Sequence, residues 1–488
     1  MKVSVPKGTR DFSPAEMVKR NFIFKTIREV FEKYGFQPIE TPAMEQLETL
    51  TGKYGEEGDK LIFKILNSGN YLEAAKVRKH VLKDIGENNF SKLDLVVGDY
   101  YPLGFVATPK ELLNDISEKA LRYDLTVPFA RYVVQHQNEI SFPFKRYQIQ
   151  PVWRADKPQK GRYREFFQCD ADVIGSDSLL NEVEIVQMID EVMTKLKINV
   201  TIKINNRKLL QGIADYFKIT NFTEFVTILD KADKMGVKFI KEELSAKNIL
   251  HHPETEIFGT LFFEAEQKEL KQAVEKNKLN LIRVWSEEVK SEAGMKGIEE
   301  MGTVFTLLRS CALQTAACDL DISLARGLNY YTGAIFEVKA NGVEMGSICG
   351  GGRYDDLTGN FGLPNVSGVG ISFGIDRIFD VMNELNLFES LGLPASTTKV
   401  MLAHFGATER KYCIGVAAQL RSAGINTEIY PDVTKKISKQ FDYANKKQIP
   451  FVIVIGADEV NTGDLTLKDM NSGQQSKVKL NEIINLLK

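Results

Sequence analysis

The stretch FKRYQIQPVWRADKPQKGRYREFFQCDADVIG, residues 144–175, decides the fold of the surrounding chain. Two runs rich in aromatic and β-branched side chains, 144–154 and 164–175, flank the basic loop ADKPQKGRY at 155–163. Runs of this composition on either side of a turn-forming loop are typical of paired strands. The stretch therefore predicts an antiparallel hairpin with a long basic loop.

The segments before the hairpin predict further short elements. The motif SPAE at 13–16 forms a capping box with proline at the first helical position, and apolar residues then recur at helical spacing up to Gly35. Residues 36–44, FQPIETPAM, predict a short strand whose prolines belong at a sheet edge or an interface. Residues 121–126, LRYDLT, predict a strand that leads through Thr126, as the cap, into a helix.

Changes of sequence pattern along the chain predict its organisation. Helical patterning with charged faces dominates the middle of the chain, and strand and helix alternate after a linker rich in Pro, Ser and Thr. We expect a core in two parts, 1–205 and 315–390, an insertion of unknown role at 69–118, a helical insertion at 206–314, a linker at 391–398 and a small α/β domain at 399–488.

Composition limits the class of protein. Hydrophobic residues make up 43% of the 488 residues and charged residues 26%, which is ordinary globular usage. No apolar run approaches the roughly 20 residues that span a bilayer, and the N-terminus shows no signal or transit pattern, so we expect a cytoplasmic protein. The formal net charge is −2, so any nucleic-acid surface must be local. The five cysteines show no C-x-x-C pair, and we expect no metal site built from Cys or His.

Arginines gather in and around the hairpin loop. Arg154 and Arg162 belong to this set, and Arg326 and Arg377 lie farther along the chain in glycine-containing, strand-like sequence. Guanidinium groups suit phosphate oxygens, so several arginines that converge on one sheet would make a nucleotide site. The alternative is a solvated basic hairpin.

The glycine run at 350–352 also permits two interpretations. Glycines allow close approach of the backbone to a ligand, and they also form simple turns. The run fits neither a P-loop nor a dinucleotide-binding motif, which disfavours a parallel nucleotide-binding sheet in this region.

Five motifs, in order along the chain, carry a family resemblance. LRYDLTVPFAR, VWRADKPQKGRYREFFQCDADVIG and GISFGIDR resemble the motifs of class II aminoacyl-tRNA synthetases. LARGLNYYTG and GGGRYDDL resemble two segments particular to histidyl-tRNA synthetases. The resemblance covers nearly the whole chain except the 69–118 insertion.

The resemblance implies a fold, an activity and partners. It implies an α+β catalytic core, with a mixed, mainly antiparallel sheet flanked by helices, plus a helical insertion and a C-terminal α/β anticodon-binding domain. It implies activation of L-histidine with ATP, followed by transfer of histidine to tRNA(His). Mg²⁺ is expected through the ATP phosphates, and a homodimer through the N-terminal helix and the proline-containing strand.

The resemblance also assigns ligands. Arg154 would hold the ATP α-phosphate, Arg377 would stack near adenine and meet the γ-phosphate, and Arg162 would serve the outer phosphates or the tRNA end. Arg326 would approach the substrate carboxylate and the α-phosphate, and we expect Arg326 and Arg154 to be catalytic. The remaining positions would bind histidine: Asp124, Thr126 and Gln168 at the α-amino group, and Asp172, Tyr331 and Tyr354, with Tyr330 beside them, at the imidazole.

The chemistry of imidazole agrees with this assignment. Its two ring nitrogens can meet a carboxylate and a tyrosine hydroxyl, and a buried polar site rejects analogues that leave its groups unpaired. The alternative for each tyrosine is core packing with a satisfied hydroxyl.

Departures from the family pattern and rival functions remain. Asn329 stands where the family commonly has aspartate, and Asp124 and Asp172 stand where some relatives have glutamate. One rival is a non-catalytic regulatory paralogue, although such relatives tend to lose the arginines or the terminal domain. The other rival is a class II synthetase for threonine or proline, which would lack LARGLNYYTG.

Overall fold

The computed structural model describes residues 3–69, 116–251, 289–326, 330–433 and 436–488. The described chain forms two compact units. The first comprises Met1–Arg10 and Phe24–Leu385, and the second comprises Asp11–Ile23 and Asn386–Lys488. The 69–118 insertion that we predict falls almost wholly outside the described residues, as does Asn329.

An eight-stranded sheet forms the centre of the first unit. Neighbouring strands are antiparallel except at the two edges, where β1 pairs in parallel with β5 and β7 with β8. The prediction of a mixed, mainly antiparallel sheet is confirmed. In spatial order the strands are β1 (Gln37–Pro38), β5 (Phe144–Trp153), β6 (Glu165–Ile174), β11 (Gly368–Gly374), β10 (Cys349–Tyr354), β9 (Ala334–Ala340), β7 (Val200–Asn206) and β8 (Ala316–Leu320).

The predicted hairpin is confirmed as the pair β5 and β6. Their antiparallel register runs from Phe144 opposite Ile174 to Trp153 opposite Glu165. Because side chains alternate between the two faces of a strand, Gln168 and Asp172 of β6 share one face, while Cys169 and Ala171 lie on the other. The hairpin therefore divides a polar face from an apolar one.

Helices cover the apolar face. The chain from 13 to 33 has the predicted capping box, since the Ser13 backbone N–H donates to Glu16, whose own N–H donates to the Ser13 hydroxyl. Helix α1 (Pro14–Lys33) places Phe31 against Tyr147 of β5 and Phe373 of β11. Helices α7 (Leu180–Leu196) and α15 (Ile375–Glu384) also contact the sheet. The opposite, polar face is left for a cavity.

Two predictions about the N-terminal third are wrong in detail. Residues 36–44 do not form one strand, because β1 joins the large sheet and β2 (Met44–Gln46) joins a separate three-stranded sheet with β4 and β3. The strand expected at 121–126 ends at Leu121, so β4 is only Lys119–Leu121. Pro38 does lie at an edge of the large sheet, in β1, whereas Pro42 lies between β1 and β2. Strand β3 is Lys64–Ile65.

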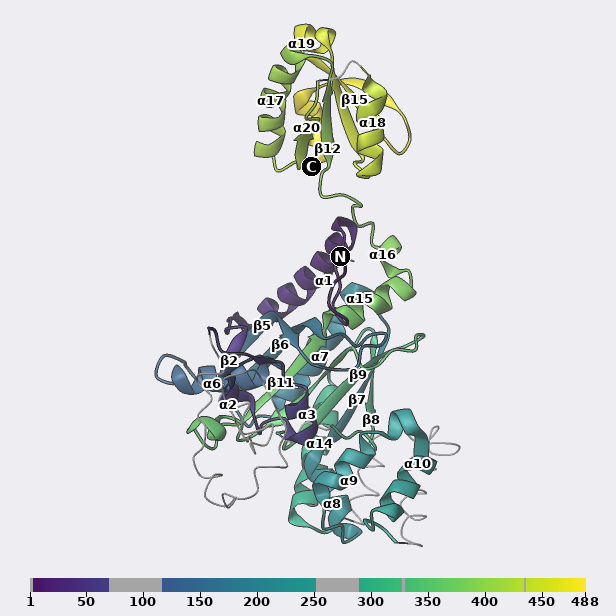
Figure 1. Ribbon diagram of the computed structural model, residues 1–488. Coiled ribbons are helices and arrows are strands. Elements are labelled where there is room, and N and C mark those ends of the chain that lie inside the picture. The colour runs from purple at the N-terminus through teal and green to yellow at the C-terminus, as the bar shows by residue number, and fades with distance from the viewer. Residues whose placement is uncertain (1–2, 70–115, 252–288, 327–329, 434–435) are drawn as a thin grey trace, which may run out of the picture. The chain divides into compact units, whose positions relative to one another are not determined.

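The described elements between β7 and β8 are helices. They are α8 (Arg207–Tyr216), α9 (Phe222–Leu229), α10 (Ala232–Ala246) and α14 (Glu292–Leu308). Figure 1 shows these helices grouped beside the β7–β8 edge of the sheet, and α14 contacts both α8 and β7. Helix α8 begins directly after β7, so the helical group is joined to this side of the sheet without a linker.

The second unit contains a five-stranded sheet in the order β13-β12-β14-β15-β16. Strand β12 pairs in parallel with β13 and β14, whereas β14–β15 and β15–β16 are antiparallel, so the α/β prediction is confirmed. Helices α17 (Ala407–Ser422), α18 (Ile437–Lys446), α19 (Ala457–Thr462) and α20 (Leu480–Leu487) belong to this unit. The strands are β12 (Val400–His404), β13 (Thr427–Ile429), β14 (Phe451–Ile455), β15 (Asp464–Asp469) and β16 (Gln475–Lys479).

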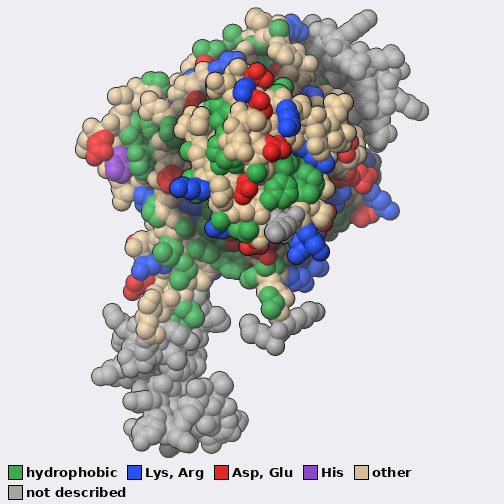
Figure 2. Space-filling model, turned by 90° about the horizontal axis from the view of Figure 1, so that it is seen from above, with side chains coloured by type: hydrophobic (Ala, Val, Ile, Leu, Met, Phe, Trp, Pro, Cys, Tyr) green, Lys and Arg blue, Asp and Glu red, His purple; other side chains and the backbone are tan. Residues whose placement is uncertain are grey.

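Charge is mixed over the visible surface. On the face drawn in Figure 2, Lys and Arg side chains are interspersed with Asp and Glu side chains. This mixture agrees with a formal net charge of −2. None of the helices in the described part of the chain is both long and apolar enough to cross a lipid bilayer.

Candidate active site

A cavity of about 1050 Å³, including solvent at its mouth, opens on the polar face of the eight-stranded sheet. Its walls come from β6, β10, β11, the start of α6 (Thr126–Gln135), the hairpin loop and the segment around Tyr330. All of the predicted ligand residues line this one cavity: Asp124, Thr126, Arg154, Arg162, Gln168, Asp172, Arg326, Tyr330, Tyr331, Tyr354 and Arg377. The fold therefore brings these residues together although they lie far apart in the sequence.

The floor of the cavity is a row of polar side chains on β6. Gln168, Asp170 and Asp172 point to the same face because they are two residues apart. The Gln168 amide donates to the Ser372 hydroxyl of β11 at 2.6 Å. Burial raises the pKa of Asp170 to about 7, while the charge of Arg146 opposes the shift. The row thus presents buried acceptors to whatever enters the cavity.

Asp172 is held on both of its oxygens. The Tyr354 hydroxyl donates to one oxygen at 2.7 Å, and the guanidinium of Arg146, with its side chain 0% exposed, lies 2.8 Å from the other. Burial raises the pKa of Asp172, and Arg146 counteracts this effect. Because the partner Arg146 balances its charge, Asp172 can act as a fixed acceptor for a ring N–H.

Asp124 occupies the opposite wall. It accepts from the Tyr54 hydroxyl at 2.9 Å and from the Val127 backbone N–H at 3.1 Å, and the Tyr330 hydroxyl lies 3.5 Å away. The prediction of Thr126 as the helix cap is therefore wrong. Asp124 caps the first turn of α6, and Thr126 is the first helical residue. The Asp124 carboxylate, two residues before Thr126, accepts from the Val127 N–H of this turn, and Thr126 lines the cavity.

Three tyrosines form an aromatic cluster beside these acids. The ring of Tyr330 lies 4.8 Å from that of Tyr331 and 6.4 Å, edge-on, from that of Tyr354. Burial raises the pKa of Tyr330 and Tyr354, and the Asp172 charge adds to the shift at Tyr354. Their hydroxyls consequently stay protonated, and that of Tyr354 already donates its proton to Asp172.

The glycine run at 350–352 is the interior of strand β10 and is not a turn. A Cβ at Gly350 would lie 2.1 Å from Arg326 Nη1, and one at Gly352 would lie 2.8 Å from the ring of Tyr331. Gly350 and Gly352 therefore make room for the side chains of Arg326 and Tyr331. The sequence left open a close approach to a ligand or a simple turn, and the structure shows a third role, in which the glycines admit pocket side chains.

Arg326 is partly buried and lies against β9 and β10. Its Nη1 donates to the Phe336 carbonyl at 3.0 Å, and its guanidinium carbon lies 5.7 Å from the Tyr331 ring centroid. Although burial works against the charged form, the surrounding Tyr331 and Glu337 raise the pKa of Arg326. A permanent positive charge is thus fixed at the cavity wall.

Arg154, Arg162 and Arg377 form a second group, which we call the arginine set. Arg154 donates to the Tyr123 carbonyl at 3.0 Å, and Arg377 donates to the carbonyls of Gly161 and Ser347 at 2.7 and 2.5 Å. Arg162 lies 3.6 Å from a carboxylate oxygen of Asp156 and is partly exposed.

The charges of the arginine set repel one another. Burial is the largest cause of the lowered pKa of Arg377, and the positive charges of Arg162 and Arg154 lower this pKa further. The acids Glu337 and Asp156 oppose this shift, but the pKa of Arg377 stays lowered, so an anionic ligand would further offset the positive charge.

Comparisons with known proteins agree with the cavity. The family model described as histidyl-tRNA synthetase matches residues 8–73 and 115–378, and a model described as anticodon binding domain matches residues 397–488. The chain belongs to the histidyl-tRNA synthetase family. This membership confirms the family predicted from the five motifs and sets aside a synthetase for threonine or proline.

Relatives match over the full chain. A histidine–tRNA ligase of Cytophaga hutchinsonii is 51% identical over 488 residues, which is 100% of this chain and 99% of that protein. A histidine–tRNA ligase of Phocaeicola vulgatus is 50% identical over 488 residues, which is again 100% of this chain and 99% of that protein. The crystal structure of histidyl-tRNA synthetase from Nostoc sp. has a TM-score of 0.76 and 30% identity, and it covers 100% of this chain and 99% of that one.

The family motifs did not identify three residues of the cavity region. Asp170 lines the floor, Tyr54 donates to Asp124, and Arg146 balances Asp172. The alternation along β6 could have identified Asp170, since it lies between Gln168 and Asp172 on one face. No local signal points to Tyr54, because it meets Asp124 only through the tertiary fold.

The hairpin loop of this family member is tied to the N-terminus. Arg10 donates to the Tyr163 hydroxyl at 2.9 Å and to Asp376 at 2.7 Å, and it lies 3.2 Å from Asp380. Tyr163 also donates to Asp380 at 2.8 Å. These contacts fix the loop that carries Arg162.

Acidic side chains of the cavity do not gather into a metal cage. Within the described ranges, no group of three or more His, Cys, Asp or Glu is placed to hold a metal ion.

Proposed function

We propose that this member of the family is a histidine–tRNA ligase, which forms histidyl-adenylate and pyrophosphate from L-histidine and ATP and then esterifies histidine to tRNA(His). One observation carries the proposal. Residues that the family motifs assign to histidine and ATP come from distant parts of the sequence and line one cavity. The 51% identity to a named histidine–tRNA ligase over the full chain supports it.

The acidic set, Asp124, Asp170 and Asp172, binds the amino acid in this proposal. Asp124, Thr126 and Gln168 receive the α-ammonium group, and the unpaired Oε1 of buried Gln168 is an acceptor without a donor among the described residues. Asp172 accepts from one imidazole nitrogen, and a tyrosine hydroxyl from Tyr330, Tyr331 or Tyr354 meets the other. Apolar analogues of similar shape would leave these buried groups unpaired.

The arginine set binds ATP. Arg154 holds the α-phosphate, Arg377 meets the γ-phosphate beside adenine, and Arg162 serves the outer phosphates or the tRNA end. Planar guanidinium groups suit this task because each offers paired N–H donors to phosphate oxygens. The like-charge contacts around Arg377 favour such a ligand.

Catalysis then rests on positioning and charge. The histidine carboxylate attacks the α-phosphorus in line, and pyrophosphate leaves. Arg326 and Arg154 offset the negative charge that develops at the α-phosphate, so no protein nucleophile is required. Mg²⁺ bound by the phosphates would neutralise charge on the leaving pyrophosphate. The terminal ribose hydroxyl of the tRNA next attacks the adenylate.

Several further properties belong to the proposal. The two core segments, 1–205 and 315–390, form the catalytic core, 206–314 forms a helical insertion domain, and 399–488 after the linker at 391–398 binds the anticodon. Association into a homodimer and a cytoplasmic location complete the proposal.

The test is amino-acid-dependent exchange of pyrophosphate into ATP, measured with each of the twenty amino acids, followed by charging of tRNA(His). We expect exchange with histidine alone and charging of tRNA(His). Histidine binding without exchange would replace this proposal with the regulatory paralogue, and exchange with a different amino acid would refute the assignment of the imidazole pocket.

A further inference from the structure

The segment from Arg326 to Gly333 carries three of the residues to which we assign substrate contacts. Arg326 begins it, and Tyr330 and Tyr331 precede Thr332 and Gly333. Residues 327–329 lie outside the described part of the chain, so we consider only how Arg326 and residues 330–333 are held. Placement of the Arg326, Tyr330 and Tyr331 side chains depends on which groups bind their backbone.

Arg207, the first residue of α8, binds both ends. Its backbone N–H donates to the Gly333 carbonyl at 2.8 Å, and its guanidinium Nη1 donates to the Arg326 carbonyl at 3.2 Å. The residue is only 9% exposed. A single residue of the helical group therefore joins the start and the end of the segment.

The helical group in turn fixes Arg207. Its guanidinium carbon lies 5.1 Å from the ring centroid of Phe222 in α9. Burial lowers the pKa of Arg207, and the negative charge of Asp230, at the end of α9, opposes this shift. The side-chain interactions of Arg207 therefore come from α9 as well as from the segment itself.

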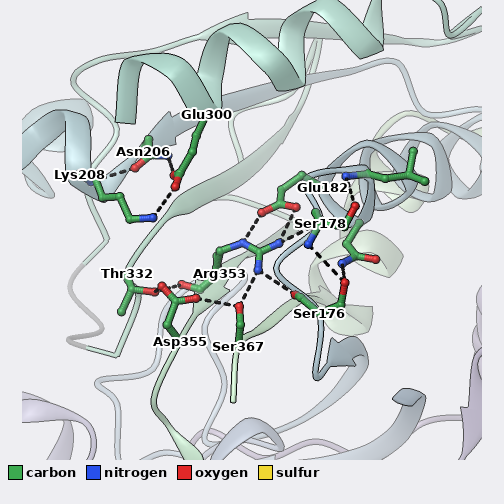
Figure 3. Close-up of polar contacts among 12 residues, drawn as sticks. Ser176, Ser178, Glu182, Asn206, Lys208, Glu300, Thr332, Arg353, Asp355 and Ser367 are labelled. Atoms are coloured by element: carbon green, nitrogen blue, oxygen red, sulfur yellow. Dashed lines mark hydrogen bonds and ion pairs between the residues drawn. The ribbon is translucent and has the colours of Figure 1, made fainter. Parts of the chain in front are cut away.

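The residues on either side of Arg207 share one partner. Asn206 Nδ2 and Lys208 Nζ donate to the two carboxylate oxygens of Glu300 in α14, at 2.8 and 2.5 Å. Figure 3 shows this pair of contacts above the Arg353 network. The start of α8 is thus held in place by α14.

A second network holds the segment from the side of the sheet. Thr332 donates through its N–H to the Arg353 carbonyl at 2.8 Å and through its hydroxyl to Asp355 at 2.7 Å. The Arg353 guanidinium binds Glu182 and Ser367, and Ser367 donates to Asp355, as Figure 3 shows. This network fixes Thr332. The Arg326 side chain is bound separately, at the Phe336 carbonyl, and the Arg326 backbone carbonyl is bound by Arg207.

We propose that Arg207 is a positioning residue, which transmits the placement of the helical group to Arg326 and the tyrosine pocket. It touches no substrate in this arrangement. The inference rests on the proposed function, because it assigns Arg207 to the adenylation step. Loss of its guanidinium would let the Arg326 carbonyl, and with it the Arg326 side chain, leave the geometry that the α-phosphate requires.

The experiment compares Arg207→Met, Arg207→Lys and Lys203→Met with wild type. Methionine keeps the apolar stem and the backbone N–H but removes the donor to Arg326. Lysine restores one donor. Lys203→Met is the matched control, because Lys203 lies on β7 and forms a 2.6 Å ion pair with Asp321 that does not involve the segment. Pyrophosphate exchange gives kcat and KM, and thermal unfolding is measured on each variant.

We expect Arg207→Met to lower kcat for exchange about tenfold or more, with a smaller change in KM for ATP, and Arg207→Lys to recover part of the loss. Lys203→Met should keep kcat within about twofold at a similar or greater loss of thermal stability. Equal kcat in Arg207→Met and wild type, or equal loss in both methionine variants, would overturn the inference. Absence of exchange in wild type would instead refute the proposed function.

Discussion

The acidic set and the arginine set line the same cavity, but their charged groups differ in the partners that the protein provides. Asp124 and Asp172 accept hydrogen bonds from tyrosines, and Asp172 also has a guanidinium partner within the protein. Arg154 and Arg377 donate hydrogen bonds to backbone carbonyls, Arg154 also lies over the rings of Tyr123 and Phe166, and the positive charges of Arg154 and Arg162 act against that of Arg377. The acidic set is therefore built before substrate arrives, whereas the arginine set is completed by an anion.

This difference suggests how the two substrates are recognised. A prebuilt polar pocket gives selectivity, because any misfit leaves buried groups unpaired. A set of arginines in which Arg154 and Arg377 donate to neutral carbonyls gives affinity and stabilises developing charge, because the ligand itself supplies negative charge. Substitutions in the two sets should therefore fail in different ways.

The largest expected effect comes from Arg326, which lies where the two sets meet. Arg326→Ala removes the fixed charge assigned to the carboxylate and the α-phosphate, so kcat for histidine-dependent exchange should fall about 10³-fold or more. Steady-state exchange kinetics measure this change. Activity within tenfold of wild type would show that Arg326 does not act at the reacting atoms.

The next effect concerns the acidic set. Asp172→Glu keeps the charge beside Arg146 but moves it by one methylene, so KM for histidine should rise about 10- to 100-fold while KM for ATP changes little. Asp172→Asn would leave the buried Arg146 unbalanced and should destabilise folding by about 3 kcal/mol or more in chemical denaturation. A charge-conserving variant with unchanged histidine KM would contradict the assigned role of Asp172.

The arginine set should show the reverse selectivity. Arg377→Met removes an anion-binding guanidinium, and KM for ATP should rise about tenfold or more without a matching change for histidine. Lys160→Met is the control, because Lys160 is an exposed loop cation that pairs with Glu384. If both substitutions raise KM for ATP equally, general loop charge rather than Arg377 binds the nucleotide.

The pKa of Asp170 gives a stability prediction. Its folded value of about 7 exceeds the unfolded value of 3.8 because of burial, so folding stability is lost as pH rises between those values. Asp170→Asn cannot ionise and should be more stable than wild type above pH 7, by up to about 4 kcal/mol, and similar to it near pH 4. Denaturant unfolding at several pH values measures the difference; an equal difference at every pH would contradict it.

The smallest expected effect comes from Tyr54. Tyr54→Phe removes one hydroxyl donor to Asp124 and leaves the Val127 N–H in place, so KM for histidine should rise about fivefold, equivalent to about 1 kcal/mol. Exchange kinetics measure it. An unchanged KM would show that the Val127 contact alone orients Asp124.

The sequence predicted the parts of this site that short motifs encode. The hairpin follows from alternation and composition between 144 and 175, and the ligand residues follow from family motifs. Contacts across the fold have no such signal. The Tyr54–Asp124 bond joins a short helical region to the start of α6, and the interior strand position of Gly350 to Gly352 depends on packing against Arg326 and Tyr331.

Predictions from residue type also failed where two local structures were possible for the same residues. Thr126 is an acceptable cap by residue type, but Asp124 reaches the same turn with a charged acceptor and leaves Thr126 inside the helix. The segment at 36–44 has strand composition throughout, but its parts pair with different sheets. Residue type alone could not choose between these outcomes, because tertiary partners decided them.

The central claim, that one cavity binds the amino acid and the nucleotide through separate residue sets, is tested most directly by calorimetric binding of each ligand alone. L-histidine and ATP with Mg²⁺ are titrated separately into wild type, Asp172→Glu and Arg377→Met. We predict that Asp172→Glu weakens histidine at least tenfold and ATP by less than about threefold, and that Arg377→Met does the reverse. Equal weakening of both ligands by either substitution would contradict the claim.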